Sequence, residues 1–473
     1  MGKIDITSFY IYRWRYWLGY SFIVLLLVGS LYIAAFHIPG SVSSLEEQSI
    51  IRSSQLGTNL SITNVPINAP YYSLQHLTLS LFGPTLLGIK LPSLILGFLT
   101  AIFMVILLRK WFRSNIAVLS SIIAITTGQF LLLAQEGSSG ILYVFWPVVL
   151  LLIATLIAKR AKHRFVWKIL FFVSAALSLY TPLSIYVLIA LGSAAVLHPH
   201  LRYIVRKLSR LKLLGGMIAG AIIITPLVVS CVHNPQLLLS LLGIPNSWPN
   251  LLENAEKLIG QYVGFLSFGD GRAIMPIFGL GSFLLILYGY YRLLRSRDTV
   301  QSYLILTWTI LLLPILIINP VYISIMFVPL LLALATGLSA LLRIWYTLFP
   351  LNPYARIAGL LPLVVLVLSL TIFGIGRYEY GYRYAPDIVA HYSNDLELLP
   401  RNTSTIVVAP EEKLFYTALA KYNKDLRVVD TPPSSNGFTT TGAMRQSDLT
   451  PSRIITNGRE SNSARYYVYS NVR

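Results

Sequence analysis

The chain has 473 residues, of which 55% are hydrophobic and only 12% are charged, and its mean hydropathy is +0.67. A composition this apolar excludes an ordinary soluble protein and predicts an integral membrane protein. The formal net charge of +19 does not indicate a nucleic-acid partner, because the basic residues cluster beside apolar segments, as the positive-inside rule describes. The single cysteine, Cys231, excludes an intrachain disulfide and a cysteine-based metal site.

About eleven apolar segments follow one another along the chain, each long enough for a helix to cross about 30 Å of hydrocarbon. The expected spans are 17–36, 86–108, 115–134, 141–158, 166–181, 183–198, 213–232, 275–291, 302–319, 321–342 and 357–375. Between the fifth and sixth, Tyr180-Thr181-Pro182 is either a tight external turn or a kink in one long helix. The first segment is expected to be a retained span rather than a cleaved signal.

The short loops on one side of these spans carry 21 Lys and Arg residues, and those on the other side carry four, namely Arg52, Lys90, Lys257 and Arg272. Because basic loops stay in the cytoplasm, the asymmetry fixes the orientation. With an odd span count, we expect a multi-pass protein of the plasma (inner) membrane whose N-terminus is cytoplasmic and whose C-terminus is extracytoplasmic.

Two outer loops, 37–89 and 233–274, are long enough to form structure of their own. The run from Pro70 to Gly83 mixes aromatic, apolar and small polar residues and predicts an interfacial segment that ends at Gly83-Pro84. In the later loop, an amphipathic stretch is expected around Leu251–Phe268.

From about residue 377 the composition changes, since the last 97 residues hold 22 of the 55 charged residues. Strands are predicted at Ser404–Val408, Leu426–Val429, Ser452–Thr456 and Tyr466–Tyr469, with a helix at Glu411–Tyr422 and a Pro/Ser/Gly/Thr-rich stretch at Thr431–Thr441. We therefore expect a transmembrane domain over 1–376 and a small extracytoplasmic α/β domain over 377–473. That second domain carries no phosphate loop and no His/Cys cluster, so no chemistry is assigned to it.

Eight acidic residues precede the tail, and six of them lie on the outer side. Two are adjacent, Glu46 and Glu47, about ten residues after the first span. On a helix their side chains diverge by about 100°, so one can face a cleft while the other caps the helix. The simpler interpretation is a helix start in a solvated loop, in which Ser44 and Glu47 have the spacing of a capping box.

Four motifs, in their order along the chain, resemble those of the GT-C class of membrane glycosyltransferases. This class includes the protein O-mannosyltransferases and the lipid A aminoarabinose transferases. The motifs are the acidic pair Glu46-Glu47; the interfacial segment from Pro70 to Gly83 with Gly88-Ile89-Lys90-Leu91-Pro92-Ser93; Gln261-Tyr262 with Phe265 and Phe268-Gly269-Asp270; and Asn319-Pro320-Val321-Tyr322 with Pro329, Ala333 and Ala335. Together they extend over residues 37–337.

The resemblance implies an all-α polytopic fold and an inverting transferase whose donor is a sugar on a polyprenyl phosphate. Membrane lipids and this donor are the expected partners, the acceptor stays open, and neither a cofactor nor a metal is assigned. By the match, Glu46 is the base and Glu47 its supporting acid. The phosphate contacts are expected from Lys90, Arg52 and Arg272, and the further site lining from His76, Glu136, Asp270 and Tyr322.

The sequence also departs from the family pattern. Glu46 stands where Asp is usual, and Lys90 and Val321 stand where Arg is usual, so bidentate phosphate contacts are lost. Snorkelling at a helix end is an alternative interpretation of Lys90. Glu136 is either a supporting site residue or an interfacial carboxylate, of which the second is favoured. A non-catalytic GT-C-like scaffold, or a transporter of lipid-linked sugars, is the alternative function.

Overall fold

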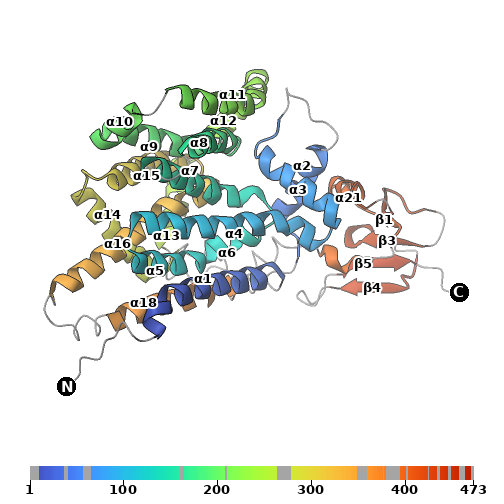
Figure 1. Ribbon diagram of the computed structural model, residues 1–473. Coiled ribbons are helices and arrows are strands. Elements are labelled where there is room, and N and C mark those ends of the chain that lie inside the picture. The colour runs from blue at the N-terminus through green and yellow to red at the C-terminus, as the bar shows by residue number, and fades with distance from the viewer. Residues whose placement is uncertain are drawn as a thin grey trace.

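The computed structural model describes residues 10–36, 41–56, 65–159, 164–207, 210–263, 278–348, 360–376, 378–379, 395–400, 403–423, 425–433, 437–445, 449–456 and 464–469. The chain forms a bundle of long helices with a small sheet at one end (Figure 1).

Helices occupy all eleven positions at which the sequence predicts a span. The helices at these positions are α1 (Tyr10–Phe36), α4 (Leu86–Trp111), α5 (Ser114–Ile125) with α6 (Gly128–Gln135), α7 (Leu142–Ala158), α8 (Arg164–Ser178), α9 (Ser184–Leu197), α11 (Arg210–His233), α14 (Leu280–Arg295), α15 (Val300–Ile318), α16 (Phe327–Leu348) and α18 (Leu360–Gly376). The shorter helices between them are α2 (Ser44–Leu56), α3 (Ala69–Phe82), α10 (Pro199–Arg206), α12 (Pro235–Leu242) and α13 (Leu251–Val263).

Five of the described helical segments are long and apolar enough to cross a membrane, and the number rises to seven if each of two bent pairs is one span. The pair α5–α6 bends by 63° and the pair α9–α10 by 94°. The structure thus shows a mostly helical protein with several apolar segments of membrane length, and the count of eleven spans stays a prediction. Around Tyr180 the helix ends at Ser178 and resumes at Ser184, with Leu183 at a φ of 62°, which favours the turn over the kink.

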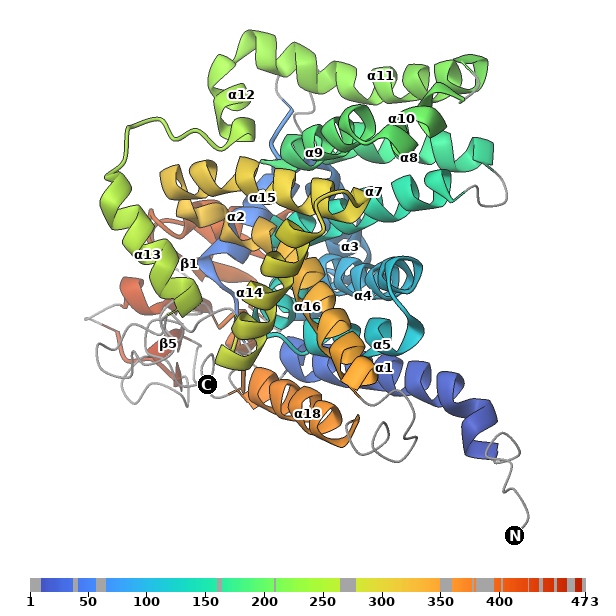
Figure 2. The ribbon, with the colours of Figure 1, turned by 90° about the vertical axis from the view of Figure 1, so that its left-hand side faces the viewer.

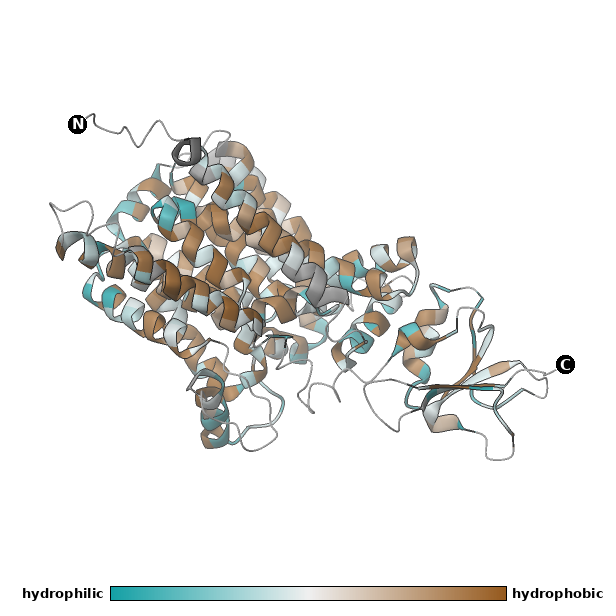
Figure 3. Cartoon of the chain, turned by 90° about the horizontal axis from the view of Figure 1, so that it is seen from below, coloured by the Kyte–Doolittle hydropathy of each residue, from teal (hydrophilic) through white to brown (hydrophobic). Residues whose placement is uncertain are grey.

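The bundle is apolar almost throughout, whereas the sheet region mixes hydrophobic and hydrophilic residues (Figure 3). Among the candidate spans of the bundle, the segment Pro320–Leu348, which contains α16, is the most buried, and α16 crosses α14 in the middle of the bundle (Figure 2). At this crossing Gly289 and Gly337 allow the two backbones to touch, because a Cβ on Gly289 would meet the carbonyl group of Ala333 and one on Gly337 that of Leu285. Small residues permit such close approach of membrane helices.

Helices α2 and α3 lie between the bundle and the sheet (Figure 1). The predicted interfacial segment is α3, which begins after Asn68 at a φ of 61° and ends at Gly83 at a φ of 71°. From there α4 runs to a last turn that carries Arg109 and Lys110. The end of the bundle that bears α2, α3 and the sheet is therefore opposite the basic end of α4.

The sheet has five strands in the order β2-β1-β3-β5-β4. They are β1 (Thr405–Val407), β2 (Arg427–Val429), β3 (Phe438–Thr441), β4 (Arg453–Thr456) and β5 (Ala464–Tyr469), with the helix α21 (Lys413–Ala420) between β1 and β2. Strand β1 is parallel to β2 and β3, and β5 is antiparallel to β3 and β4.

No strand is predicted within the Pro/Ser/Gly/Thr-rich stretch Thr431–Thr441, but its last four residues form β3, the central strand of the sheet. The run Phe438-Thr439-Thr440-Thr441 is aromatic and β-branched, as strands prefer. It is hidden in the sequence by the preceding Pro, Ser and Gly residues.

The sheet region packs on α2, α3 and the start of α4 through one apolar cluster. Ile50, Leu79 and Ile89 from the bundle side contribute to it, as do Phe415 and Leu419 of α21. Two polar contacts cross the same junction. The Nδ1 atom of His76 lies 2.7 Å from the Tyr422 hydroxyl, and Lys421 donates to the Ser54 carbonyl at 3.3 Å.

Candidate functional site around helix α2

Helix α2 begins with a reciprocal capping box. The Glu46 amide donates to the Ser43 hydroxyl at 3.1 Å, and the Ser43 amide donates to Oε2 of Glu46 at 2.8 Å. The two free donors at the helix start are thereby satisfied. The sequence interpretation of Ser44 and Glu47 as this box is wrong by one residue, and Glu46 is the carboxylate that caps the helix.

The second oxygen of Glu46 reaches the loop that follows α6. Its Oε1 atom accepts from the Gly137 amide at 2.6 Å and lies 3.7 Å from Nζ of Lys90. Lys90 also donates to Oε1 of Gln135 at 3.2 Å. Both members of this ion pair are buried, with exposed fractions of 1% and 0%. Burial raises the pKa of Glu46, while Lys90 and the Gly137 amide oppose that rise.

Lys90 therefore does not snorkel from the helix end, because its ammonium group is inside the protein and its partner is Glu46. This placement also removes it from direct contact with a lipid phosphate in the structure as it stands. A buried ion pair of this kind holds two elements in one arrangement, because removing either partner leaves an uncompensated buried charge.

Glu136 is a second buried carboxylate beside Glu46, with 6% of its surface exposed. It accepts from the Ser43 hydroxyl at 3.3 Å and from the Ser138 hydroxyl at 2.9 Å, and its charge contributes to the raised pKa of Glu46. Glu136 is therefore packed inside the protein rather than exposed on its surface. Together with Glu46 and Lys90 it forms what we call the buried charge cluster.

Gln75 connects the same three segments through its amide. Its Nε2 donates to the carbonyl groups of Ile89 and Gly137 at 3.2 and 2.9 Å, and its Oε1 accepts from the hydroxyls of Ser49 and Ser53 at 2.6 and 2.7 Å. All four hydrogen-bonding capacities of this side-chain amide are used at 0% exposure. Helix α2 is therefore fixed in its rotation about its own axis.

That rotation gives α2 three distinct faces. Glu46, Ser49 and Ser53 are buried against the bundle, and Ile50 packs toward the sheet. The third face carries the exposed residues Ser44, Leu45, Gln48, Arg52 and Gln55. At 100° per residue, Glu47 lies on the edge between the sheet side and this exposed face, and it is half-buried.

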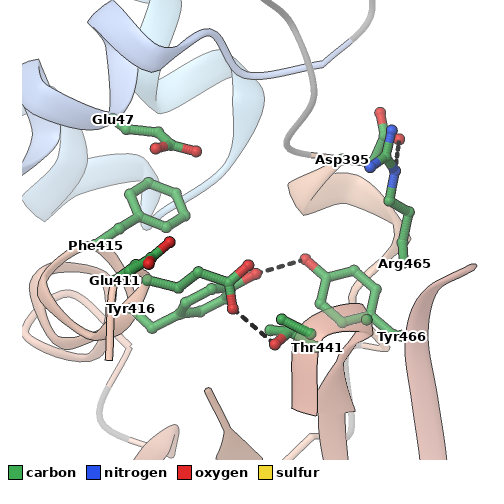
Figure 4. Close-up of a pocket in the computed structure, with 11 residues that line it drawn as sticks. Glu47, Asp395, Glu411, Phe415, Tyr416, Thr441, Arg465 and Tyr466 are labelled. Atoms are coloured by element: carbon green, nitrogen blue, oxygen red, sulfur yellow. Dashed lines mark hydrogen bonds and ion pairs between the residues drawn. The ribbon is translucent and has the colours of Figure 1, made fainter. Parts of the chain in front are cut away.

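Glu47 faces a cavity of about 510 Å³ between α2 and the sheet region (Figure 4). The cavity is lined by Glu47, Asp395, Glu411, Glu412, Phe415, Tyr416, Thr441, Gly442, Ala443, Arg465 and Tyr466. Arg465 donates to Asp395 at 3.0 Å, and Thr441 donates to Glu412 at 2.7 Å. The hydroxyls of Tyr416 and Tyr466 lie 3.0 Å apart, and burial raises the pKa of Tyr466 to about 12. The lining is thus acidic, with neutral phenols at physiological pH.

Arg52 lies on the exposed face of α2, next to tyrosine side chains at this end of the bundle. Its Nη1 donates to the Tyr72 hydroxyl at 3.3 Å, and its guanidinium carbon is 5.9 Å from the centre of that ring. Tyr322 lies close enough to Arg52 for the two side chains to interact electrostatically. The ring of Tyr322 in turn lies 5.7 Å from that of Tyr143. An exposed cation among phenols suits an anionic group at a membrane interface.

The structure places the predicted residues that it describes at three sites around α2. Glu46, Lys90 and Glu136 form the buried charge cluster. Arg52 and Tyr322 lie near each other on the exposed side of α2. His76 is at the junction with the sheet, where it contacts Tyr422, and Glu47 lines the cavity there. Arg272 and Asp270 fall outside the described residues. Among the residues the structure does describe, no group of three His, Cys, Asp or Glu side chains is placed to hold a metal ion.

Sequence reasoning missed the polar residues that position the carboxylates. Ser43, Gln75, Gln135 and Gly137 are each one turn or one loop away from a residue that the sequence analysis singled out. The signal for Gly137 is its size, since a Cβ there would approach the Ile89 carbonyl oxygen to 2.7 Å. The signal for Gln75 is a polar residue in the middle of an apolar interfacial helix.

Comparison with sequence families agrees with the resemblance seen in the motifs. The model of the dolichyl-phosphate-mannose-protein mannosyltransferase family matches residues 65–229, a range that includes α3, α4 and Glu136 but not α2 or the sheet. No curated protein sequence matches the chain at a significant level.

Solved structures extend the likeness to nearly the whole chain. The structure of ArnT from Cupriavidus metallidurans bound to undecaprenyl phosphate has a TM-score of 0.56 at 12% identity, over 95% of this chain and 97% of that one. An Archaeoglobus fulgidus oligosaccharyltransferase tethered to an acceptor peptide has a TM-score of 0.53 at 14% identity, over 89% of this chain. This chain spans 64% of the length of that oligosaccharyltransferase. The fold is therefore that of the GT-C membrane glycosyltransferases, with a divergent sequence.

Proposed function

We propose that the protein is a membrane glycosyltransferase that moves a sugar from a polyprenyl-phosphate donor to an acceptor at the end of the bundle that bears α2. The observation that carries the proposal is the setting of α2. The buried charge cluster fixes this helix so that Arg52 is exposed beside Tyr72 and Glu47 is exposed to the cavity under the sheet. The GT-C fold supports the same conclusion, because the similar ArnT structure contains undecaprenyl phosphate.

The donor would lie on the exposed face of α2, with its phosphate at Arg52. Glu47 and Arg52 are five residues apart, or about 7.5 Å along a helix that rises 1.5 Å per residue. Gln48 lies between them on the helical wheel. The sugar of the donor would extend along this face toward Glu47, which is at its edge.

In the proposed reaction the acceptor hydroxyl attacks the anomeric carbon, and the bond from that carbon to the phosphate oxygen breaks. Glu47 takes the proton of the hydroxyl as general base. The polyprenyl phosphate leaves with the bonding electrons, and Arg52 stabilises the negative charge that develops on it. Attack from the face opposite the leaving phosphate inverts the anomeric centre.

This assignment reverses the roles expected for the acidic pair. Glu46 has both carboxylate oxygens engaged by backbone amides and is fully buried, so it acts as a positioning residue for α2. A general base must come within hydrogen-bond reach of its proton donor, and Glu47 is the member of the pair that lines a cavity. Lys90 acts through Glu46.

The orientation belongs to the same proposal. The sheet and α2 are at the end of α4 opposite its basic last turn, and basic loops remain cytoplasmic. We place α2, the cavity and the sheet outside the cytoplasm of a plasma (inner) membrane. The acceptor would then reach Glu47 from the extracytoplasmic side.

The test is transfer of a labelled sugar from a polyprenyl-phosphate donor by the full-length protein in liposomes. Glu47→Gln keeps the shape of the side chain and removes its basicity, so we expect kcat to fall about 10²- to 10⁴-fold. Arg52→Ala should weaken donor binding about 10- to 100-fold, the equivalent of one charge-assisted hydrogen bond. Glu253→Gln, on an exposed ion pair of α13, is the matched control and should leave transfer unchanged.

Glu46→Gln separates the two carboxylates. If Glu46 only positions α2, this variant should unfold at a lower temperature, while its folded fraction keeps most of the wild-type kcat. Full activity in Glu47→Gln together with loss of activity in well-folded Glu46→Gln would reverse the assignment. Donor binding without transfer, in the wild-type protein and with every acceptor class tried, would instead identify a scaffold for lipid-linked sugars.

A further inference from the structure

A cavity of about 470 Å³ lies among α7, α8, α9, α10 and α11. It is remote from α2, because α10 is at the end of the bundle away from the sheet (Figure 1). Of the fourteen described residues that line it, thirteen are apolar or glycine, and the remaining one is Lys168. The cavity is thus a pocket for hydrocarbon with a single positive charge in its wall.

Lys168 is 5% exposed although it is on an apolar helix. A buried ammonium group in a membrane protein is costly and usually marks a site that handles negative charge. A positive charge in the wall of an otherwise apolar cavity attracts an anionic head group more strongly than a neutral one.

Helix α10 forms one wall of the cavity and lies across the end of α9, from which it turns by 94°. Its apolar residues Leu201, Ile204 and Val205 line the cavity, whereas Arg202 and Arg206 are exposed. A short helix with an apolar inner face and a basic outer face is typical of a segment that lies in the plane of a membrane surface. Such basic segments attract anionic lipids.

We infer that this cavity binds one anionic phospholipid of the leaflet at the basic end of the bundle. The acyl chains occupy the apolar space between α8 and α9, and the phosphate is held by Lys168, while the basic outer face of α10 attracts anionic lipids to this end of the bundle. The site is distinct from the proposed donor site, so its occupancy does not depend on glycosyl transfer.

Gly192 provides a variant that fills the cavity without disturbing the fold. It lines the cavity on α9, and a Cβ added there has nothing within 4 Å. Gly192→Phe should therefore place a ring in the space that an acyl chain would occupy. Replacing glycine within a helix also removes an entropic cost of folding, so the variant should remain stable.

The experiment is native mass spectrometry of the full-length protein, titrated with phosphatidylglycerol or phosphatidylcholine of identical chains. We expect one phosphatidylglycerol to be retained at concentrations at which phosphatidylcholine is lost. Lys168→Met should weaken phosphatidylglycerol binding about 10-fold or more, as for loss of one charge-assisted contact, and Lys168→Arg should restore it. Gly192→Phe should abolish the adduct.

Lys257→Met, which removes an exposed cation from α13, is the control for loss of charge and should bind as the wild type does. Thermal unfolding verifies that each variant is folded. Equal retention of the two lipids, or an adduct that survives both Lys168→Met and Gly192→Phe, would overturn the proposal and identify ordinary annular lipid.

Discussion

Lys90 and Glu46 form a buried ion pair between α4 and the start of α2. Removing one member of such a pair strands the other charge in a medium of low dielectric constant, whereas replacing both by neutral groups removes the desolvation cost on both sides. The pair therefore couples the position of α2 to the position of α4.

This coupling predicts a non-additive mutational cycle. Lys90→Met alone should lower the free energy of unfolding by about 3–5 kcal/mol, because the Glu46 carboxylate stays buried without its cation. Adding Glu46→Gln should recover much of that loss. The measurement is reversible or rate-matched unfolding in detergent, with Lys257→Met at an exposed ion pair as a control that changes little. Strictly additive effects would show that the two side chains do not interact.

The sequence indicated the acidic pair Glu46-Glu47, but it did not indicate that Glu46 would be buried and that Glu47 would line a cavity. Ser43 and Ser44 are both capable caps, and Glu46 and Glu47 follow each three residues later, so two registers of the capping box were equally compatible with the residues. Burial of Glu46 depends on Gly137, which is 91 positions away. No local pattern contains that contact.

Among the elements, the closest crossing is that of α14 and α16. Backbone contact at this crossing requires glycine on each helix, at Gly289 and Gly337. The crossing also sets the position of α16, which begins a few residues after Tyr322 and is among the most buried helices of the bundle.

Gly289→Ala tests this crossing. The added methyl group would collide with the Ala333 carbonyl, and backbone, unlike a flexible side chain, cannot move aside cheaply. We expect a loss of about 1–3 kcal/mol, the range for overpacking a tight core. Gly260→Ala on α13, where an added Cβ meets nothing within 4 Å, should be neutral or slightly stabilising. Equal melting temperatures of the two variants would contradict the proposed role of Gly289.

The elements themselves were largely open to prediction, because hydrophobic runs of membrane length have few alternatives. The bend between α5 and α6 was not, since it interrupts one apolar run without a change in composition. The turn from α9 into α10 comes at Pro199, where the predicted span ends and basic residues follow. Strand β3 was missed for a related reason. Four residues after a Pro/Ser/Gly-rich stretch carry too little periodicity to distinguish a strand from the loop before it.

For the whole molecule, the proposed orientation places the sheet outside the cytoplasm and the loop between α10 and α11 inside. A reporter that is active only outside the cytoplasm, fused after Arg473, should therefore be active. The same reporter inserted after Lys207 should be silent, and a reporter that works only in the cytoplasm should give the opposite pattern. A silent fusion at Arg473 beside an active cytoplasmic reporter at that position would mean an even number of spans.

The junction between α2 and the sheet region also affects the order of events while the chain is being synthesised. Lys421 and Ser54, which meet there, are separated by 367 residues of chain. At a synthesis rate of 5–20 residues per second, the ribosome needs about 20–70 s to travel that distance. During that interval Ile50 and Leu79 are exposed at the membrane surface, because Phe415 and Leu419, which later cover them, have not yet been synthesised. The nascent protein thus passes through a stage in which its membrane helices are in place but this apolar patch is uncovered. During that stage an extracytoplasmic chaperone would bind the patch.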